Sequence, residues 1–463
     1  MVLSRRSAED NFYRTLLTLV LPITLQGLIS HAVNAADVFM LGYVGQDALS
    51  AVSLANQVEF WIIGFFWGAT SGTALMIAQY WGKGDREAVQ SVMGIGLKVS
   101  LAFTALLALA SLLFPAAIMT LFTGEEELVR IGAGYLRITA VTFVLQAVSQ
   151  IYECSMRSIG RAAVATVMSS AALLANVVLN AALIFGLFGL PRLGVTGVAV
   201  ATVIARLLEA VLCVLDALKS RVIRYDWRTL LGRNAALTRD FFRYSIPALA
   251  NDISWTLAFS SYSVILGHLG SDVVAAAAVA TTVRDFCSVA CMSLGAAAVT
   301  IIGNQLGAGN LEGARRDGNR ILWLSLIIGT ATGLVILALR PLLVRVFPLT
   351  DSARDYLRFM LLVSSYYLVG QTVNTVVITG VFRAGGDTKF GMWCDTINMW
   401  CVSVPIGFVS AFVLHLPPKW VYFILCLDEF YKVPVEVIHY RKYKWLRNVT
   451  REAPFGPAEA EPD

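Results

Sequence analysis

The chain has 463 residues, of which 57% are hydrophobic and only 14% are charged. Soluble domains carry about 25% charged residues, so this composition excludes an ordinary soluble protein and predicts a polytopic membrane protein. The formal net charge of +5 does not indicate a nucleic-acid partner, because most basic residues lie in the loops between apolar segments.

Twelve long apolar segments are separated by short loops rich in glycine, proline and charge. Each segment is too long for a barrel strand, and only helices or closed barrels satisfy their backbone groups within lipid. We therefore expect an all-α polytopic membrane protein with twelve transmembrane helices. The expected helices are 15–43, 48–79, 91–115, 130–157, 163–189, 193–219, 240–267, 273–305, 318–346, 352–382, 388–414 and 418–440.

The first segment carries polar side chains along one helical face. Gly27, Ser30, His31, Asn34 and Asp37 follow one another at steps of three and four residues. A carboxylate inside a span costs about 2.5–3.5 kcal/mol on insertion scales, so it usually faces a partner, an ion or a water-filled cavity. We expect Asp37 to couple an ion to transport.

The basic residues predict that both termini lie in the cytoplasm. The loops on the side of the N-terminus hold most of the Lys and Arg residues, while the acidic run 125–127 falls on the other side. We expect a cytoplasmic N-terminus and two lobes of six helices, joined by a basic cytoplasmic linker and followed by a disordered tail. The N-terminus is 1–14, the N-lobe is 15–219 and the C-lobe is 240–447. The linker is 220–239 and the tail is 448–463.

The two lobes are predicted to be internal repeats, because residues recur at an offset of about 225 positions. Matched pairs include Pro22 with Pro247, Gly82 with Gly307, and Glu87 with Glu312. Six helices per repeat give both halves the same orientation, so the repeat axis is expected to run along the membrane normal. Such architectures place the substrate site between the halves and work by rocking one against the other.

Several motifs together resemble the multidrug and toxic compound extrusion (MATE) transporters, over about residues 12–447. They are Pro22 with Asp37–Gly42, Gln79–Asp85, Arg157–Arg161, Gln305–Asn310 and Phe382–Thr388. The resemblance implies a V-shaped, two-lobed bundle that exports small organic compounds, lipophilic or cationic, in exchange for H⁺ or Na⁺. Flippases for lipid-linked saccharides share the broader superfamily and are the alternative function.

The resemblance to prokaryotic members also implies a cation-coupling site in the N-lobe. Matching the family pattern gives Asp37, Asn176, Asn180 and Thr202, with Asn180 at a position where the family pattern has a second acid. This departure leaves one carboxylate and tilts the expected coupling ion toward H⁺, although Na⁺ sites can also be built largely from neutral oxygens.

Depth in the membrane supports the same grouping independently. Asp37, Asn180 and Thr202 lie about eight, eleven and ten residues from the outer ends of their helices. At 1.5 Å per residue, all three lie roughly 12–17 Å below the outer surface. Asn176 lies four residues before Asn180 and shares its helical face.

A second group of polar residues is expected to line a central substrate cavity. Glu59 and Arg284 occupy equivalent positions in the two repeats, so they could pair across the cavity, bind a charged substrate, or form a structural ion pair. Asn251, Asp252 and Trp255 lie nearer the cytoplasmic side and form a candidate second protonation or substrate site.

The remaining expectations concern chemistry, partners and location. The sequence has no His-Glu-x-x-His, nucleophile elbow or P-loop, so we expect no enzymatic activity and no cofactor beyond the transported H⁺ or Na⁺. The expected partners are small organic substrates and membrane lipid, without nucleic acid, for a monomer. The expected location is the cytoplasmic (inner) membrane of a prokaryote.

Overall fold

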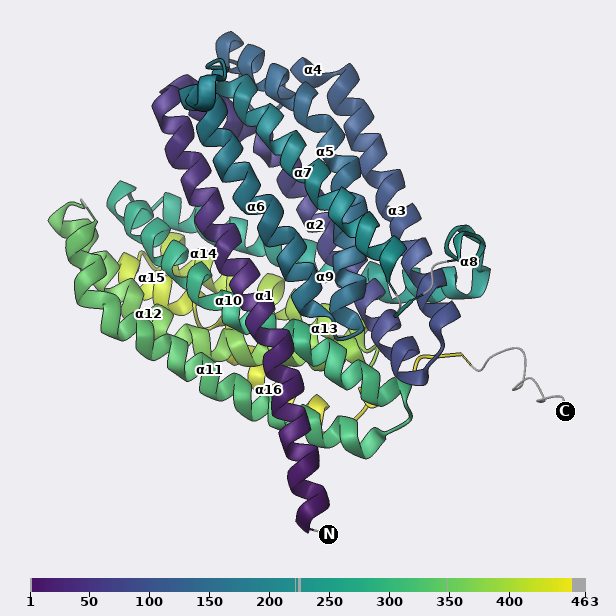
Figure 1. The fold of residues 1–463 in the computed structure, drawn as a ribbon. Coiled ribbons are helices and arrows are strands. Elements are labelled where there is room, and N and C mark those ends of the chain that lie inside the picture. Colours follow the sequence, from purple (N-terminus) through teal and green to yellow (C-terminus); the bar gives the residue numbers. More distant parts are fainter. Residues whose placement is uncertain (1, 221, 224–225, 348, 452–463) are drawn as a thin grey trace, which may run out of the picture.

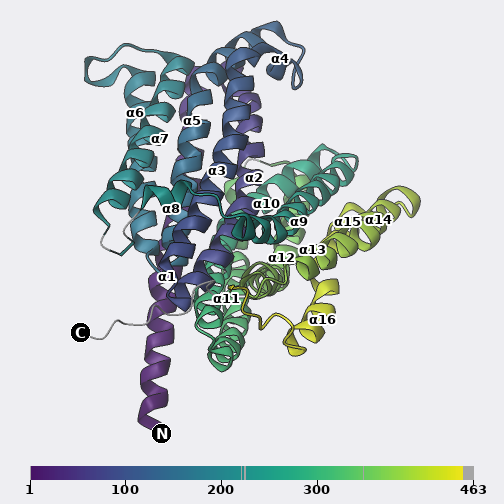
Figure 2. The same cartoon turned by 90° about the vertical axis from the view of Figure 1, so that its right-hand side faces the viewer.

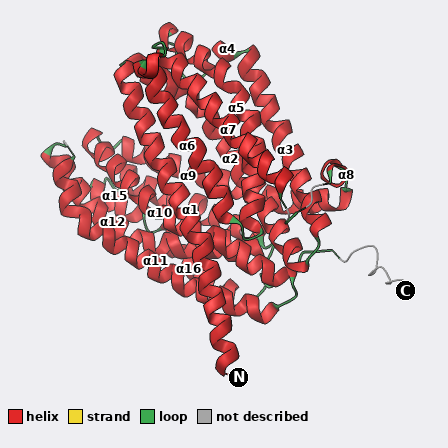
Figure 3. Ribbon diagram, in the orientation of Figure 1, coloured by secondary structure: helices red, strands yellow, loops and turns green. Residues whose placement is uncertain are grey.

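The computed structural model describes residues 2–220, 222–223, 226–347 and 349–451, and every regular element in this part of the chain is helical (Figure 3). The N-terminal half contains α1 (Val2–Val44), α2 (Gln46–Lys83), α3 (Arg86–Leu113), α4 (Pro115–Thr120), α5 (Glu126–Ser158), α6 (Ala162–Phe185), η1 (Leu187–Gly189) and α7 (Gly194–Lys219). A short helix, α8 (Trp227–Leu231), lies in the predicted linker.

The C-terminal half repeats this order with more interruptions. It contains α9 (Ala235–Gly267), α10 (Ser271–Gly307), α11 (Leu311–Val346), α12 (Asp351–Asn374), η2 (Thr375–Phe382), α13 (Thr388–Ile397), η3 (Asn398–Ser403), α14 (Val404–Phe408), η4 (Val409–Val413), α15 (Pro418–Leu425) and α16 (Asp428–Arg441). The segments η2, η3 and η4 are wider π-helical turns within otherwise continuous helices.

The prediction of twelve transmembrane helices in two repeats is confirmed. Ten described helices are long and apolar enough to span a membrane by length and composition. The other two predicted spans are α9, which carries Asn251 and Asp252, and the segment 418–440. That last segment is two helices, α15 and α16, separated by Cys426 and Leu427.

The two halves form two lobes inclined to one another (Figures 1 and 2). In Figure 2 the helices of the N-lobe stand upright, and those of the C-lobe lean away from them toward the end that carries α4 and α15. The opposite end carries the 83–86 turn and is called the inner end, following the predicted orientation. The V-shaped, two-lobed arrangement is therefore present, with its lobes together at the inner end.

The long helix α1 contacts both lobes (Figure 1). Its first half packs into the C-lobe core, where Leu16 and Leu19 lie with Leu294 and Ile301 of α10. Farther along, Met40 belongs to a core cluster of the N-lobe. Assigning this helix wholly to the N-lobe, as the predicted boundaries did, does not capture its contacts with the C-lobe.

Backbone contacts between α2 and α10 join the lobes at the inner end. A Cβ atom at Gly307 would overlap the carbonyl oxygen of Gln79, and one at Gly82 would overlap that of Asn304. The two contacts are equivalent under the predicted repeat, because Gly82 matches Gly307 and Gln79 lies 225 positions before Asn304. Only glycine allows the two helices to approach this closely.

A segment after α16, residues 442–451, crosses the inner end and is called the C-terminal strap. Within it Trp445 is fully buried, Val449 N donates to Gln79 Oε1 at 2.7 Å, and Arg451 pairs with Asp240 of α9. The predicted disordered tail began at 448. Residues 448–451 instead make hydrogen bonds with both lobes, and 452–463 lie outside the described residues.

Candidate functional site

The four residues predicted for cation coupling form one hydrogen-bonded chain within the N-lobe. Asn180 Nδ2 of α6 donates to Asp37 Oδ1 of α1 at 2.8 Å and to Asn176 Oδ1 at 3.2 Å. Asn176 Nδ2 donates to Thr202 Oγ1 of α7 at 3.5 Å. Sequence matching and helical depth therefore brought together residues of three helices that do lie in contact.

The four hydrogen-bonded residues could together form a small binding site lined by oxygen atoms. Asn180 is 1% exposed, and its Oδ1 atom is buried without a hydrogen-bond partner. A buried acceptor without a donor is costly, and a hard cation, a protonated carboxyl group or a water molecule would satisfy it. Since Asp37 is the single carboxylate among the four residues, the donor set fits a proton at least as well as a metal ion.

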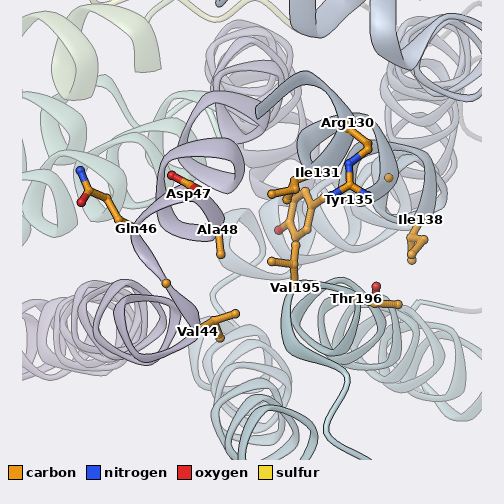
Figure 4. A pocket seen from close by; sticks show the side chains of 12 residues that line it. Val44, Gln46, Asp47, Ala48, Arg130, Ile131, Tyr135, Ile138, Val195 and Thr196 are labelled. Atoms are coloured by element: carbon orange, nitrogen blue, oxygen red, sulfur yellow. The ribbon is translucent and has the colours of Figure 1, made fainter. Parts of the chain in front are cut away.

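A hollow lies at the outer end of the N-lobe (Figure 4). Its volume is about 700 Å³, and Val44, Asp47, Arg130, Tyr135 and Thr196 are among the residues that line it. Tyr135 is 7% exposed and lies close to both Thr202 and Asp37. The Tyr135 ring, which sequence reasoning did not select, therefore lines the hollow and also lies near the Asp37 chain.

Glu59 and Arg284 each find partners in their own lobe. Glu59 accepts a hydrogen bond from Gln146 at 2.9 Å and pairs with Arg206 at 3.4 Å. The Arg284 guanidinium lies 4.8 Å from the ring centre of Tyr367, within the C-lobe. The pairing of Glu59 with Arg284 across a cavity, one of the alternatives left open by the sequence, is not the arrangement in this structure.

A pocket of about 430 Å³ lies between the lobes in the inner half of the molecule. Asn251, Asp252 and Trp255 line it as predicted, whereas Glu59 and Arg284 are not among its lining residues. The N-lobe contributes side chains of α2 and α5, and the C-lobe contributes side chains of α9, α10, α12, η2, α13 and α16. These include Trp67, Ser71, Arg157, Met292, Asn374, Thr379, Arg383, Asp395, Glu429 and Lys432.

The charges of this pocket are paired. Arg383 bonds to Asp252 at 2.7 Å and to Ser71 of the other lobe at 3.2 Å. Lys432 Nζ lies 3.0 Å from Asp395 Oδ1. The sequence analysis selected neither Arg383 nor Lys432 as a residue of this pocket.

Comparison with known proteins agrees with this architecture. The MatE family model matches residues 22–182 and 247–409, one range in each repeat. A probable multidrug resistance protein, YoeA of Bacillus subtilis, is 25% identical over 417 residues, which cover 89% of each chain. The probable multidrug resistance protein NorM of Thermotoga maritima is 24% identical over 453 residues, 95% of each chain.

Solved structures share the fold at lower identity. A crystal structure of MATE in the bent conformation has a TM-score of 0.85 at 18% identity, covering 93% of this chain and 95% of that one. An outward-facing multidrug resistance MATE family transporter of the MOP superfamily gives 0.83 at 19%, covering 92% and 95%. Since the two ranges of the family model together cover more than half of the 463 residues, the chain belongs to the MatE family.

Proposed function

We propose that this protein is a secondary active antiporter that exports small organic compounds, lipophilic or cationic, in exchange for H⁺ or Na⁺ by alternating access. The relatives named multidrug resistance proteins, which align along most of their length, support drug efflux as the general activity. The coupling ion and the exchange mechanism rest on the site itself.

The inter-lobe pocket is the observation that carries the proposal. Trp67 and Trp255 supply aromatic surface from opposite lobes, and Asp252 supplies a carboxylate. Aromatic faces and a carboxylate together suit an organic cation with apolar substituents. Because both lobes contribute to the wall, rocking one lobe against the other would open the pocket to either side of the membrane in turn.

The Asp37 chain is the proposed coupling site. An ion that enters from outside would bind between Asp37 and Asn180 and favour one arrangement of α1 relative to α6. The membrane potential adds about 2.3 kcal/mol per inward charge per 100 mV. We favour H⁺ over Na⁺, since Asp37 is the one carboxylate in this group of four hydrogen-bonded residues. The protein is proposed to work as a monomer in the inner membrane, with both termini in the cytoplasm.

A flippase for lipid-linked saccharides remains the second candidate, because three cationic side chains line the pocket. Each already has a carboxylate partner: Arg157 pairs with Glu153 at 3.4 Å, Arg383 with Asp252 at 2.7 Å, and Lys432 with Asp395 at 3.0 Å. A pyrophosphate group would have to displace these carboxylates, and an organic cation would have to displace Arg383 from Asp252, so it is the aromatic surface of Trp67 and Trp255 that favours an organic cation.

The test is efflux of a fluorescent lipophilic cation from proteoliposomes, under a pH gradient or a sodium gradient imposed separately. We expect wild-type efflux under one gradient and its loss in Asp37→Asn, with normal insertion of the variant. Ser53→Ala, an exposed position on α2, is the matched control. Normal gradient-driven efflux from Asp37→Asn would refute the coupling site, while transport of a lipid-linked saccharide without cation efflux would favour the flippase.

A further inference from the structure

The C-lobe buries a group of charged side chains that the proposed coupling site does not use. It consists of four carboxyl groups and one ammonium group, and each residue is at most 5% exposed. The group is Asp395 of α13 together with Asp428, Glu429, Lys432 and Glu436 of α16. Asp395, Glu429 and Lys432 also line the inter-lobe pocket, so the group connects the pocket to the interior of the C-lobe.

Three of the four carboxyl groups have donors. Lys432 Nζ lies 3.0 Å from both Asp395 Oδ1 and Glu429 Oε2. Asn374 Nδ2 donates to Glu429 Oε2 at 2.7 Å. Asp428 accepts from the backbone N of Glu429 at 2.8 Å and from Tyr262 at 3.3 Å. These contacts satisfy ionised carboxylates.

Glu436 differs from the other three. It is 1% exposed, and both of its carboxyl oxygens are buried without a hydrogen-bond partner. It lies one helical turn beyond Lys432, within electrostatic range of Lys432, Asp395 and Glu429. An ionised carboxylate without a donor is strongly disfavoured in a membrane interior, and a single proton removes that charge.

The balance of charges in this group also favours binding of a proton. Lys432 offers one positive charge to four carboxyl groups, so full ionisation would leave a large net negative charge in a buried space. The described residues include no set of three or more His, Cys, Asp or Glu side chains that could hold a metal ion. Lys432, Asp395, Glu429 and Cys394 lie within electrostatic range of Glu436. The elements packed against α16 also carry Tyr366, Tyr367, Lys389 and Cys401, and α16 itself carries Asp428, Tyr431, His439, Tyr440 and Arg441.

We propose that Glu436 is a second proton-binding site, and that Asp395, Lys432 and Glu429 link its protonation to the charge of the compound in the pocket. The linkage rests on the proposed function; the proton site itself does not. An organic cation beside Asp395 and Glu429 stabilises negative charge nearby, so Glu436 releases its proton to water. Protonation of Glu436 from outside reverses the step and releases the cation, with one charge exchanged for one.

A titratable pair lies farther along α16 toward the inner end. His439 follows Glu436 by three residues and bonds through Nε2 to Asp387 Oδ2 at 2.6 Å. Their side chains are 13% and 14% exposed, so this pair reaches the surface that Glu436 does not.

The proton site is tested first, by infrared spectroscopy of the full chain in lipid. At neutral pH we expect wild type to show a protonated-carboxyl C=O band that shifts in D₂O. In Glu436→Gln this band should lose the intensity that one carboxyl group contributes. Glu59→Gln, which removes a carboxylate already paired with Arg206, is the matched control and should keep the band. Glu436→Asp keeps a carboxyl group and should show a shifted band. An unchanged band in Glu436→Gln would overturn the proposal.

The linkage is tested by counting protons released when tetraphenylphosphonium binds, with a pH dye in weakly buffered solution. Glu436→Gln should release about one proton fewer per bound cation than wild type. An equal count in the two proteins would overturn the linkage. If the cation binds neither protein, the proposed substrate class fails, while the infrared result still decides the proton site.

Discussion

At the scale of single residues, the contact with most consequence for the pocket is the Asp252–Arg383 pair. The two side chains are 2.7 Å apart, and Arg383 also reaches Ser71 on the opposite lobe at 3.2 Å. The pair therefore contributes one charge of each sign to the pocket and joins the lobes. Removing one partner of a buried pair leaves the other charge uncompensated, which costs more than the pair itself contributes.

Asp252→Asn should weaken binding of a lipophilic cation by about tenfold or more, because it adds one net positive charge to the pocket; tenfold corresponds to about 1.4 kcal/mol. Quenching of tryptophan fluorescence, with Trp67 and Trp255 in the pocket wall, measures the affinity. The double variant Asp252→Asn with Arg383→Gln restores the net charge and should recover part of the loss. Unchanged affinity in the single variant would place the cation elsewhere.

Glu59 illustrates the limit of residue-level prediction. The repeat predicts equivalent positions for Glu59 and Arg284, yet the partners of Glu59, Arg206 and Gln146, come from other helices of its own lobe. The Asp37 chain was predictable because a motif and three helix depths agreed. Arg383 and Lys432 were not, since a count of loop charges does not show which basic side chains turn inward.

Glu59→Gln should lower thermal stability without changing ion coupling. Arg206 pairs with both Glu59 and Glu209, and the substitution removes the first of these pairs. A half-buried pair of this kind contributes on the order of 1 kcal/mol. The midpoint of thermal unfolding in detergent should fall by a few degrees, while efflux keeps its gradient dependence. Loss of coupling at unchanged stability would contradict this structural role.

At the scale of elements, the helices themselves followed from hydrophobicity and the interruptions did not. The twelve segments were located, but the break between α15 and α16 and the π-helical turn η2 were not. The turn η2 carries the pocket residue Thr379, and the break is followed by the pocket residue Glu429 at the start of α16. Local backbone departures of this kind depend on tertiary contacts, which apolar periodicity does not encode.

The close approach of α2 and α10 should be required for the lobes to come together at the inner end. Gly307→Leu should prevent the closed arrangement, because any Cβ at this position overlaps the carbonyl oxygen of Gln79. A cysteine at the pocket position Ala74 should then react with a maleimide applied from the inner side. Gly309→Leu is not a suitable control because its φ is +75°, whereas Ala308→Leu tests side-chain size at an exposed neighbouring site. Protection of the cysteine in Gly307→Leu would show that this contact does not close the inner end.

At the scale of the whole molecule, the contacts that join the lobes at the inner end include the α2–α10 approach and the C-terminal strap. The α2–α10 contacts are reciprocal under the repeat, as the sequence match of Gly82 with Gly307 anticipated. No residue of the C-terminal strap belongs to a matched pair in the sequence, so the repeat did not predict the strap. It binds Gln79 of the N-lobe and Asp240 of the C-lobe at once, so it favours the state in which the inner ends are together.

Deleting residues 448–463 should therefore shift the molecule toward an inward-open state. The deletion removes three hydrogen bonds between the strap and α2 of the N-lobe: Val449 N to Gln79, Arg451 N to the Tyr80 hydroxyl, and Lys83 Nζ to the carbonyl oxygen of Arg451. At about 0.5–1.5 kcal/mol for each hydrogen bond, the combined loss changes the ratio of the two states by about tenfold or more. The buried Trp445 is retained, so the C-lobe core should stay intact.

Pulsed electron paramagnetic resonance on spin labels at Glu87 and Glu312 measures this shift, with the seven native cysteines replaced. These exposed residues are equivalent in the two repeats and lie at the inner ends of α3 and α11. The truncation at 448 should lengthen the distance between the labels. Removal of 452–463 alone is the matched control and should not, because it leaves the described strap contacts in place. Identical distance distributions in the two truncations would mean that the α2–α10 contacts hold the inner end closed without the strap.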